Sequence, residues 1–598
     1  MKFRSHFATL LLLVLIVPIL AACGGTPAVT TPTTAPVAPT TAPVAPTTAP
    51  AATTAPVATT EAATAAPVAT EAATTAPTGG DSENFLVYGG SGEPDSLDSM
   101  KTTAGTALIV ASQILEGLIG TKPGQFELDP ALATEWSPNA DSTEWTFKLR
   151  PDVVFHDGTP FNADAVVFNF QRMSDPTNKY SYADKGVTYD IFPYIFAGYA
   201  NEPNSIWKNV EKVDDLTVKF TFKQPTPLFP NYVSSSYFGL SSPAAVQKYA
   251  EKYGTPESGA VGTGPFTFSE WRAGESVTAV RNEAYWGTKA LMPGVVFRII
   301  ADQSARFTEL RNGSIDFTVN LAPDTLEAIK ADSTLQQVSV EPFNIAYLAL
   351  NTSNKPLDNP LVRQAIAYAI NKEAILKGFY GNIGEVATDF LPASLKDARP
   401  DNVEAYSYNP AKAKELLAQA GFPDGFDTVT LSDTTTAPLQ FWFMPVSRPY
   451  FPTPEVIANQ IASDLQAVGI KVSLQSEDWA VYLDNEAAGK KNGMYMLGWT
   501  GDYADPNNFL QVHFGSAGAG STYYSNADVD KLLSQASAAK TAAEANALFK
   551  QAGLLINRDM PRIPIVHAPP VFAARAEVKG WTPNPTGGDD FSIISVTR

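Results

Sequence analysis

The sequence predicts an α/β fold that extends from about residue 84 to residue 598. Apolar and polar residues alternate in several early segments, which predicts half-buried strands. Later segments carry apolar residues at helical spacing, and such an alternation of strands and helices is typical of α/β lobes. The length allows two or three lobes.

Two strand patterns are clear, in residues 144–149 and 217–222. The second follows a predicted turn at Asp214 and Asp215. In both segments every second residue is apolar, so that one face of each strand can be buried. The apolar positions are Trp145, Phe147, Leu149, Val218, Phe220 and Phe222.

Helices are predicted at residues 361–370 and 455–468, where apolar residues recur three and four positions apart. Gly469 ends the second helix, and the alternating apolar residues of 470–474 then predict a strand.

Capping residues support two more helices. Asn409 as N-cap, Pro410 at the first helical position and Gly421 as the stop bound one helix. Thr541 and Glu544 have the spacing of a capping box for the other. Its expected apolar residues are Leu548, Leu554 and Leu555.

The first 22 residues have the pattern of a secretory signal. Two basic residues precede an apolar run from about Phe7 to Leu20, which is shorter than the roughly 20 residues that span a bilayer. The end of the run, Leu20-Ala21-Ala22-Cys23-Gly24, resembles the bacterial lipobox, in which the signal is cut before a lipid-modified cysteine. We therefore expect a lipid anchor at Cys23, the only cysteine of the chain.

Residues 23–83 are predicted to form a lipid-anchored stalk. Residues 26–80 are almost entirely Thr, Ala, Pro and Val, with Glu61 and Glu71 as the only charges. Such a segment cannot build a core and stays extended, and its threonines are candidates for O-glycosylation.

Composition excludes several classes of function. The net charge of −19 disfavours nucleic acid as a partner. A single cysteine excludes disulfides and zinc–thiolate sites, and four scattered histidines predict neither a metal site nor a cofactor.

Two motifs resemble catalytic or phosphate-binding elements. Adjacent His156 and Asp157 are interpreted as a turn rather than a catalytic pair, and the Gly-rich residues 262–266 lack the Lys-Ser/Thr of a phosphate loop.

Four segments occur in an order that resembles the family 5 extracellular solute-binding proteins, which serve ABC importers of peptides and nickel. They are Pro130–Phe168, Val261–Phe266, Tyr347–Ile375 and Gly498–Leu510. The sequence departs from the family only at the turn Asp141-Ser142, where Asp-Gly is usual. The segments 444–450, 477–483 and 498–506 resemble in particular the dipeptide-binding members.

The resemblance implies a two-lobed periplasmic-binding-protein-like fold of class C, or type II, with mixed sheets and an extra subdomain in the first lobe. The expected ranges are 84–343 for lobe I, 344–568 for lobe II and 569–598 for the return to lobe I. The two crossovers are expected near Asn344 and Ala568, with the ligand buried between the lobes.

The resemblance also implies a site for a short peptide, with Asp502 for the ammonium group and Arg448 for the carboxylate. Burying a zwitterion costs free energy unless each end meets an opposite charge, and a guanidinium grips a carboxylate with two parallel bonds. From residue type alone, Asp502 could instead be a turn former and Arg448 part of a structural ion pair.

Three aromatic residues complete the expected site. Tyr450 and Trp479 could wall the pocket or belong to the core, and Trp499 is expected to support the loop that carries Asp502. Asp505 is interpreted as a turn residue.

The expected function is that of a monomeric binding protein, not an enzyme. It would capture short peptides by lobe closure and deliver them to an ABC permease, on the outer face of the cell membrane. Oligosaccharide, glutathione, haem or a nickel chelate are alternative ligands, and a sensory role remains open. A secreted hydrolase is a remote alternative, since no GxSxG or HExxH motif occurs.

Overall fold

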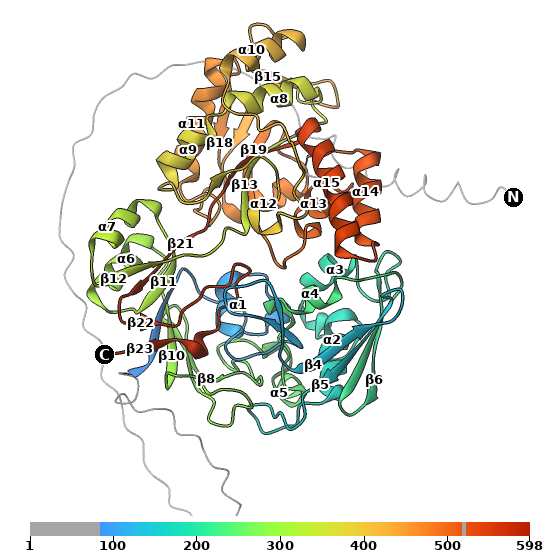
Figure 1. Cartoon of the computed structure of the whole chain (residues 1–598), viewed down its shortest axis with the longest axis vertical. Coiled ribbons are helices and arrows are strands. Elements are labelled where there is room, and N and C mark those ends of the chain that lie inside the picture. The colour runs from blue at the N-terminus through green and yellow to red at the C-terminus, as the bar shows by residue number, and fades with distance from the viewer. Residues whose placement is uncertain (1–83, 517–521) are drawn as a thin grey trace, which may run out of the picture. The chain divides into compact units, whose positions relative to one another are not determined.

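The computed structural model describes residues 84–516 and 522–598 (Figure 1). The expected signal, the anchor at Cys23 and the stalk therefore lie outside the described residues. Within the described ranges, no helix has both the length and the hydrophobicity that a membrane span requires. The mixed α/β architecture expected from the sequence is confirmed.

One large sheet has seven strands in the order β12-β21-β11-β1-β10-β9-β8. Its central strand β1 pairs in parallel with β10 and β11, whereas the other pairs are antiparallel, so the sheet is mixed. The strands are β1 (Leu86–Gly90), β8 (Phe266–Arg272), β9 (Ser276–Arg281), β10 (Gly294–Ile299), β11 (Phe317–Leu321), β12 (Leu335–Val338) and β21 (Val571–Arg575).

A four-stranded antiparallel sheet, β4-β5-β7-β6, forms a separate layer covered by helix α2 (Ala163–Ser174). Both strands predicted from alternation are present, as β5 (Glu144–Leu149) and β7 (Thr217–Phe222), and their apolar residues are buried. The neighbouring strands are β4 (Ala133–Pro138) and β6 (Trp207–Asp214). Aromatic rings such as Phe170, Trp207 and Phe220 fill the space beneath α2.

The second large sheet has six strands in the order β14-β20-β13-β19-β17-β18. The strands are β13 (Asn344–Leu350), β14 (Glu385–Val386), β17 (Gln440–Trp442), β18 (Ser473–Gln475), β19 (Met494–Thr500) and β20 (Arg562–His567). Figure 1 shows helices flanking this sheet on two sides. They are α8 (Pro360–Ala369), α9 (Lys372–Phe379), α11 (Pro454–Ala467), α13 (Asn507–Phe514), α14 (Ala527–Ser537) and α15 (Ala542–Asp559).

Short helices complete the fold. They are α1 (Gly105–Ala111), α3 (Ile191–Phe196), α4 (Phe229–Val233), α5 (Pro243–Tyr249), α6 (Gln303–Asn312), α7 (Leu326–Ala331), α10 (Pro410–Gln419) and α12 (Trp479–Ala487). Small two-stranded sheets pair β2 (Ile119–Thr121) with β3 (Leu128–Pro130), β15 (Thr428–Thr430) with β16 (Thr436–Pro438), and β22 (Val578–Lys579) with β23 (Ser595–Val596).

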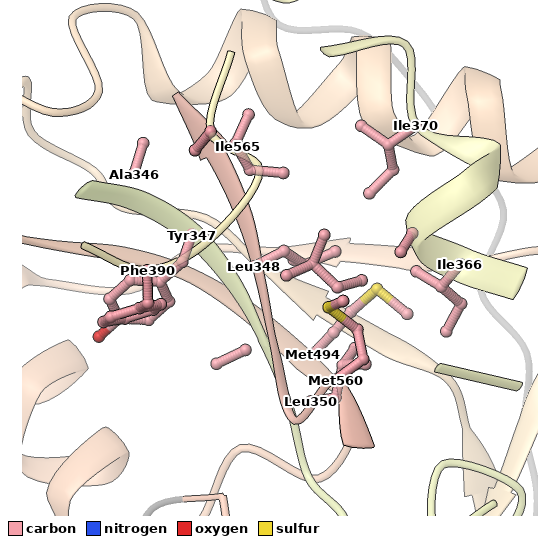
Figure 2. Close-up of a cluster of buried hydrophobic side chains, with 14 of the residues drawn as sticks. Ala346, Tyr347, Leu348, Leu350, Ile366, Ile370, Phe390, Met494, Met560 and Ile565 are labelled. Atoms are coloured by element: carbon pink, nitrogen blue, oxygen red, sulfur yellow. The ribbon is translucent and has the colours of Figure 1, made fainter. Parts of the chain in front are cut away.

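The core of the six-stranded sheet lies around Leu348 and Leu350 of β13, which are fully buried (Figure 2). Ile366 of α8, Met494 of β19 and Ile565 of β20 surround them in the same cluster. Every residue of β13 and of β20 is buried, as expected for strands that lie inside a sheet covered on both faces.

Most helix predictions are confirmed. Helix α8 and helix α11 lie within one residue of the predicted ranges, and Gly469 adopts the expected positive φ of 94° after α11. The Asn409 side chain accepts a hydrogen bond from the Lys412 backbone N–H (3.0 Å), which makes it the N-cap of α10.

Two local predictions were wrong in part. The strand expected at 470–474 is only β18, because Ile470 forms a single bridge with Phe426 of a neighbouring loop instead of joining the sheet. Helix α15 buries Phe549, Ala552 and Ile556, whereas Leu554 points outward and is 43% exposed. Thr541 caps this helix as expected, but the Glu544 carboxylate accepts its bond from the Lys540 N–H rather than from Thr541.

The chain passes between the two large sheets twice, from β12 to β13 and from β20 to β21. The two passages are bonded to each other: the Asn344 side-chain amide donates to the Ala568 carbonyl (2.7 Å), and the Ala568 N–H donates to the Asn344 side-chain oxygen (3.2 Å). These connections support the proposed lobe ranges 84–343, 344–568 and 569–598, which stay a proposal.

We expect Leu348→Ala to lower the free energy of unfolding by about 2–5 kcal/mol, because the substitution leaves a cavity in a close-packed core. Urea unfolding of residues 84–598 measures this loss of stability. Leu554→Ala on the exposed side of α15 is the control and should change the free energy by less than about 1 kcal/mol. Equal losses in the two variants would contradict the assigned core.

Candidate functional site

The expected site residues follow three parallel strands of the six-stranded sheet. β17 pairs in parallel with β18 on one side and with β19 on the other. The segments after these strands carry Arg448 and Tyr450, Trp479, and Asp502 respectively. Since the carboxyl ends of parallel strands point to one edge, all four residues emerge at that edge, where ligands bind in open α/β sheets.

The loop that carries Asp502 is held by one buried amide. Asn508 accepts hydrogen bonds at its side-chain oxygen from the Asp502 backbone N–H (2.8 Å) and from Trp499 Nε1 (3.0 Å). Its Nδ2 donates to Asp502 Oδ2 (3.0 Å). Asn508 is fully buried, so this amide fixes both the backbone and the carboxylate of Asp502.

The other carboxylate oxygen of Asp502 accepts a hydrogen bond from Tyr237 Oη (2.9 Å), a residue far away in the sequence. Burial raises the pKa of Asp502, and the hydrogen bonds from Asn508 and Tyr237 act against this rise. In the part of the chain that the structure describes, no Lys, Arg or His forms an ion pair with Asp502.

Two more tyrosines lie against the same loop. The Tyr194 ring of α3 is 6.2 Å from the Trp499 ring, and the Tyr232 ring of α4 is 4.8 Å from the Tyr503 ring. Sequence reasoning named no residue before 344 for the site. Nothing in the pattern of the 22 tyrosines distinguishes these three, because their role depends on which surfaces of the chain meet.

Arg448 lies in a tight turn in which it and Phe451 exchange backbone hydrogen bonds of 2.9 and 3.0 Å. Its side chain is exposed, and the guanidinium carbon lies 4.6 Å from the centroid of the Trp479 ring. This cation–π contact orients the guanidinium without neutralising it. No carboxylate pairs with Arg448 among the described residues.

Trp479 begins helix α12, whose N-cap Asp478 accepts a hydrogen bond from the Ala480 N–H (3.0 Å). The Trp479 ring stacks on that of Tyr482 with centroids 5.7 Å apart. Tyr482 is fully buried and donates to the Met496 carbonyl of β19 (2.7 Å), so that α12 and Trp479 are attached to the sheet.

A buried cation strengthens this attachment. Lys491 Nζ pairs with Glu477 and lies 4.0 Å from the ring centroids of Trp442 and Tyr482. The pair connects the segment before β19 to the segment before α12, which limits how far Trp479 can move away from β17.

Tyr450 packs against the backbone of β19 at Gly498. A Cβ atom at that position would come within 2.2 Å of the Tyr450 ring, so only glycine allows the contact. The Tyr450 carbonyl accepts a hydrogen bond from Tyr380 Oη (2.7 Å), and burial raises the pKa of Tyr450 to about 12 while the Arg448 charge opposes the rise. Tyr450 therefore lies between Arg448 and β19.

Asp505 is a turn residue, because its side chain accepts the Asn507 N–H (2.7 Å) immediately before α13. It is 6% exposed and faces Tyr232 and Tyr503. Burial raises its pKa to about 7, and the bond from Asn507 only partly offsets this effect.

The adjacent His156 and Asp157 do not form a catalytic pair. The His156 ring contacts the Gly264 carbonyl (3.0 Å), whereas the Asp157 carboxylate accepts from the Ser242 hydroxyl (2.5 Å). Within the described residues, no group of three or more His, Cys, Asp or Glu side chains could hold a metal ion.

Comparison with known proteins identifies the family of the chain. The sequence pattern of the bacterial extracellular solute-binding proteins, family 5 Middle, matches residues 127–521. The chain is 33% identical to heme-binding protein A of Haemophilus influenzae and 32% identical to the dipeptide-binding protein of Escherichia coli. Each alignment covers 86% of this chain, with 93% and 94% of the relatives.

A solved structure extends the comparison to the fold. The periplasmic binding protein DppA of Helicobacter pylori, in complex with the peptide STSA, has a TM-score of 0.73 and 28% identity, over 86% of this chain and 98% of its own. The two-lobed fold of periplasmic binding proteins, expected from the sequence, is thereby confirmed.

We expect Asp505→Asn to gain stability relative to the unsubstituted chain as the pH rises from 4 to 8. The unfolded chain releases the Asp505 proton near pH 4, whereas the folded chain keeps it to about pH 7, so ionisation weakens the folded state across this interval. The difference in unfolding free energy should grow by roughly 4 kcal/mol.

Urea unfolding at several pH values measures this difference. Asp424→Asn, which makes the same substitution at an exposed position, is the control. A pH-independent difference for Asp505→Asn would contradict the assigned burial of its carboxyl group.

Proposed function

The chain belongs to the family 5 bacterial extracellular solute-binding proteins, and on this premise we propose that it captures short peptides for an ABC importer. Members of this family bind substrates outside the cytoplasm and are not enzymes. Its relatives include both a dipeptide-binding and a haem-binding protein, so the ligand has to be argued from the site itself.

One observation carries the proposal: an anion and a cation, neither of which has a partner of opposite charge among the described residues, emerge at the same edge of one sheet. The Asp502 carboxylate receives only neutral donors, and the Arg448 guanidinium lies on an aromatic ring. A peptide zwitterion supplies the ammonium and the carboxylate that these groups lack. Binding both ends limits the length of the ligand, because a longer peptide would leave one end unpaired.

Capture by closure of two lobes fits the connections between the sheets. A ligand drives closure only if it contacts both lobes. An ammonium group bound at Asp502 would lie beside Tyr237 and near Tyr194, which belong to the other lobe. We propose that Tyr450 and Trp479 wall the cavity near Arg448, and that Trp499 supports the loop of Asp502.

Haem is the second candidate, because one of the relatives is named for it. The histidines of the described residues do not favour iron ligation at this edge. His567 is fully buried between two backbone carbonyls, His156 lies against Gly264, and His513 is 5% exposed among aromatic rings. Peptide is therefore the better supported ligand, and an oligosaccharide becomes the favoured ligand if substitution of neither charged residue changes the affinity.

We further propose that the chain is a monomeric lipoprotein on the outer face of the cell membrane. Residues 1–22 would be the signal, Cys23 the lipid-modified residue and residues 23–83 the stalk that connects it to the two lobes. A membrane-bound permease is the partner that this arrangement implies.

Titration calorimetry of glycyl-leucine, its N-acetylated form, a tripeptide and free leucine tests the ligand. We expect the dipeptide to bind, and the N-acetylated form to bind much more weakly because it lacks the ammonium group. Asp502→Asn and Arg448→Gln should each weaken dipeptide binding by about 2 kcal/mol or more, roughly 30-fold, since one charge of the ligand would stay unpaired.

Asp424→Asn in the loop after α10 and Arg558→Gln in α15, both at exposed positions, are the matched controls and should bind the dipeptide unchanged. Asp502→Asn should also lose the discrimination between the dipeptide and its N-acetylated form. No heat with any of these peptides, together with a spectral change on adding haem, would replace the peptide proposal by the haem proposal.

We expect Cys23→Ala to abolish lipid modification and to release the chain from the membrane fraction or to block its processing. The affinity for glycyl-leucine should stay unchanged, because the proposed stalk separates Cys23 from the lobes. Detergent partitioning and fatty-acid labelling measure the first effect, and calorimetry the second. A loss of affinity would show that the stalk and the binding lobes are not independent.

A further inference from the structure

We propose that Tyr237 is a positioning residue for the ligand: its hydroxyl reaches from the first lobe to Asp502 and completes the ammonium site only when the lobes close. The inference rests on the proposed peptide-binding function and deepens it. It assigns a residue to the first lobe's part of the site, for which no residue was predicted from sequence patterns.

The position of the Tyr237 hydroxyl is determined by a rigid part of the first lobe. Its ring is 9% exposed and belongs to the aromatic cluster beneath α2. The Ser99 hydroxyl lies within hydrogen-bonding distance of the Tyr237 carbonyl (3.3 Å) and of the Gly239 carbonyl (3.4 Å), which holds the backbone that follows the ring. The hydroxyl therefore moves with the lobe rather than independently of it.

The two side chains that donate hydrogen bonds to the Asp502 carboxylate belong to different lobes. Asn508 belongs to the same loop and helix as Asp502, so its bond to Oδ2 exists whether the lobes are open or closed. Tyr237 belongs to the other lobe, so its bond to Oδ1 exists only in the closed arrangement. Closure thus supplies a second donor and fixes which of the four lone-pair sites of the carboxylate remain for an ammonium group.

The surroundings of Asp502 make this second donor important. Tyr194 and Tyr237 face it from the first lobe, and Tyr503 from its own loop. All of these groups are neutral or anionic. Burial raises the pKa of Asp502 and so favours its uncharged form, whereas the hydrogen bonds from the neutral donors Asn508 and Tyr237 lower this pKa and favour the carboxylate.

The role of Tyr237 therefore has a signature in pH. An uncharged carboxyl cannot pair with an ammonium group, so peptide binding should fall as the pH drops through the pKa of Asp502. Without the Tyr237 hydroxyl this pKa is higher in the closed form, and binding should fail at a higher pH. A residue that only shapes the interface would change the affinity without moving this midpoint.

The test compares the unsubstituted chain with Tyr237→Phe, which keeps the buried ring and removes the hydroxyl. Calorimetry with glycyl-leucine from pH 4 to pH 8 should show about tenfold weaker binding at pH 7 and an acid midpoint about one pH unit higher. The melting temperatures of the two proteins are measured in parallel to compare their folding.

Tyr232→Phe is the matched control, because it removes another first-lobe hydroxyl at the same interface, beside Tyr503 rather than Asp502. It should leave the acid midpoint unchanged. A midpoint in Tyr237→Phe equal to that of the unsubstituted chain, or the same shift in both variants, overturns the inference and leaves peptide binding intact. No binding of glycyl-leucine by the unsubstituted chain overturns the proposed function and this inference with it.

Discussion

Parallel pairing of β17 with both β18 and β19 is the constraint on which the whole candidate site depends. It directs three segments that are distant in sequence to one edge of the sheet, so that Arg448, Trp479 and Asp502 emerge together. The remaining interactions refine this placement: Asn508 fixes the Asp502 loop, and Tyr482 and Lys491 hold α12 against the sheet. Without the parallel pairing, none of these local contacts would bring opposite charges near one ligand.

The passages between the sheets set the second constraint. Asn344 and Ala568 exchange hydrogen bonds, and His567 lies with both ring nitrogens against backbone carbonyls, at 2.6 and 3.1 Å. Two short connections bonded side by side permit rotation of one sheet relative to the other but resist separation. The proposed hinge lies at the same edge as the charged residues, because Asn344 pairs with Thr500 at the end of β19. In the proposed closure, a small rotation at this point would change the width of the candidate site.

Local patterns predicted those parts of the fold that local forces determine. β5, β7, α8 and the N-cap at Asn409 follow from period, capping and burial within short segments. Asp502 and Arg448 are proposed as site residues from sequence motifs, which indicate chemistry but not geometry. Tyr237 was missed because 265 positions separate it from Asp502, and no local signal marks a tyrosine whose partner arrives through the tertiary fold. The predictions for the strand at 470–474 and for Leu554 were wrong for a similar reason. Contacts with neighbouring segments, and not the local pattern, determine where these residues lie.

Because Gly498 has no side chain, its position limits which substitutions the candidate site can accept during evolution. Because the Tyr450 ring rests directly on that position, no other amino acid fits there without displacing the ring and, with it, the turn of Arg448. Single substitutions at Gly498 therefore cannot reshape the proposed site next to Tyr450. New ligand preferences in descendants of this chain would have to arise from the tyrosines of the opposite lobe and from the start of α12, where side chains can be exchanged one at a time.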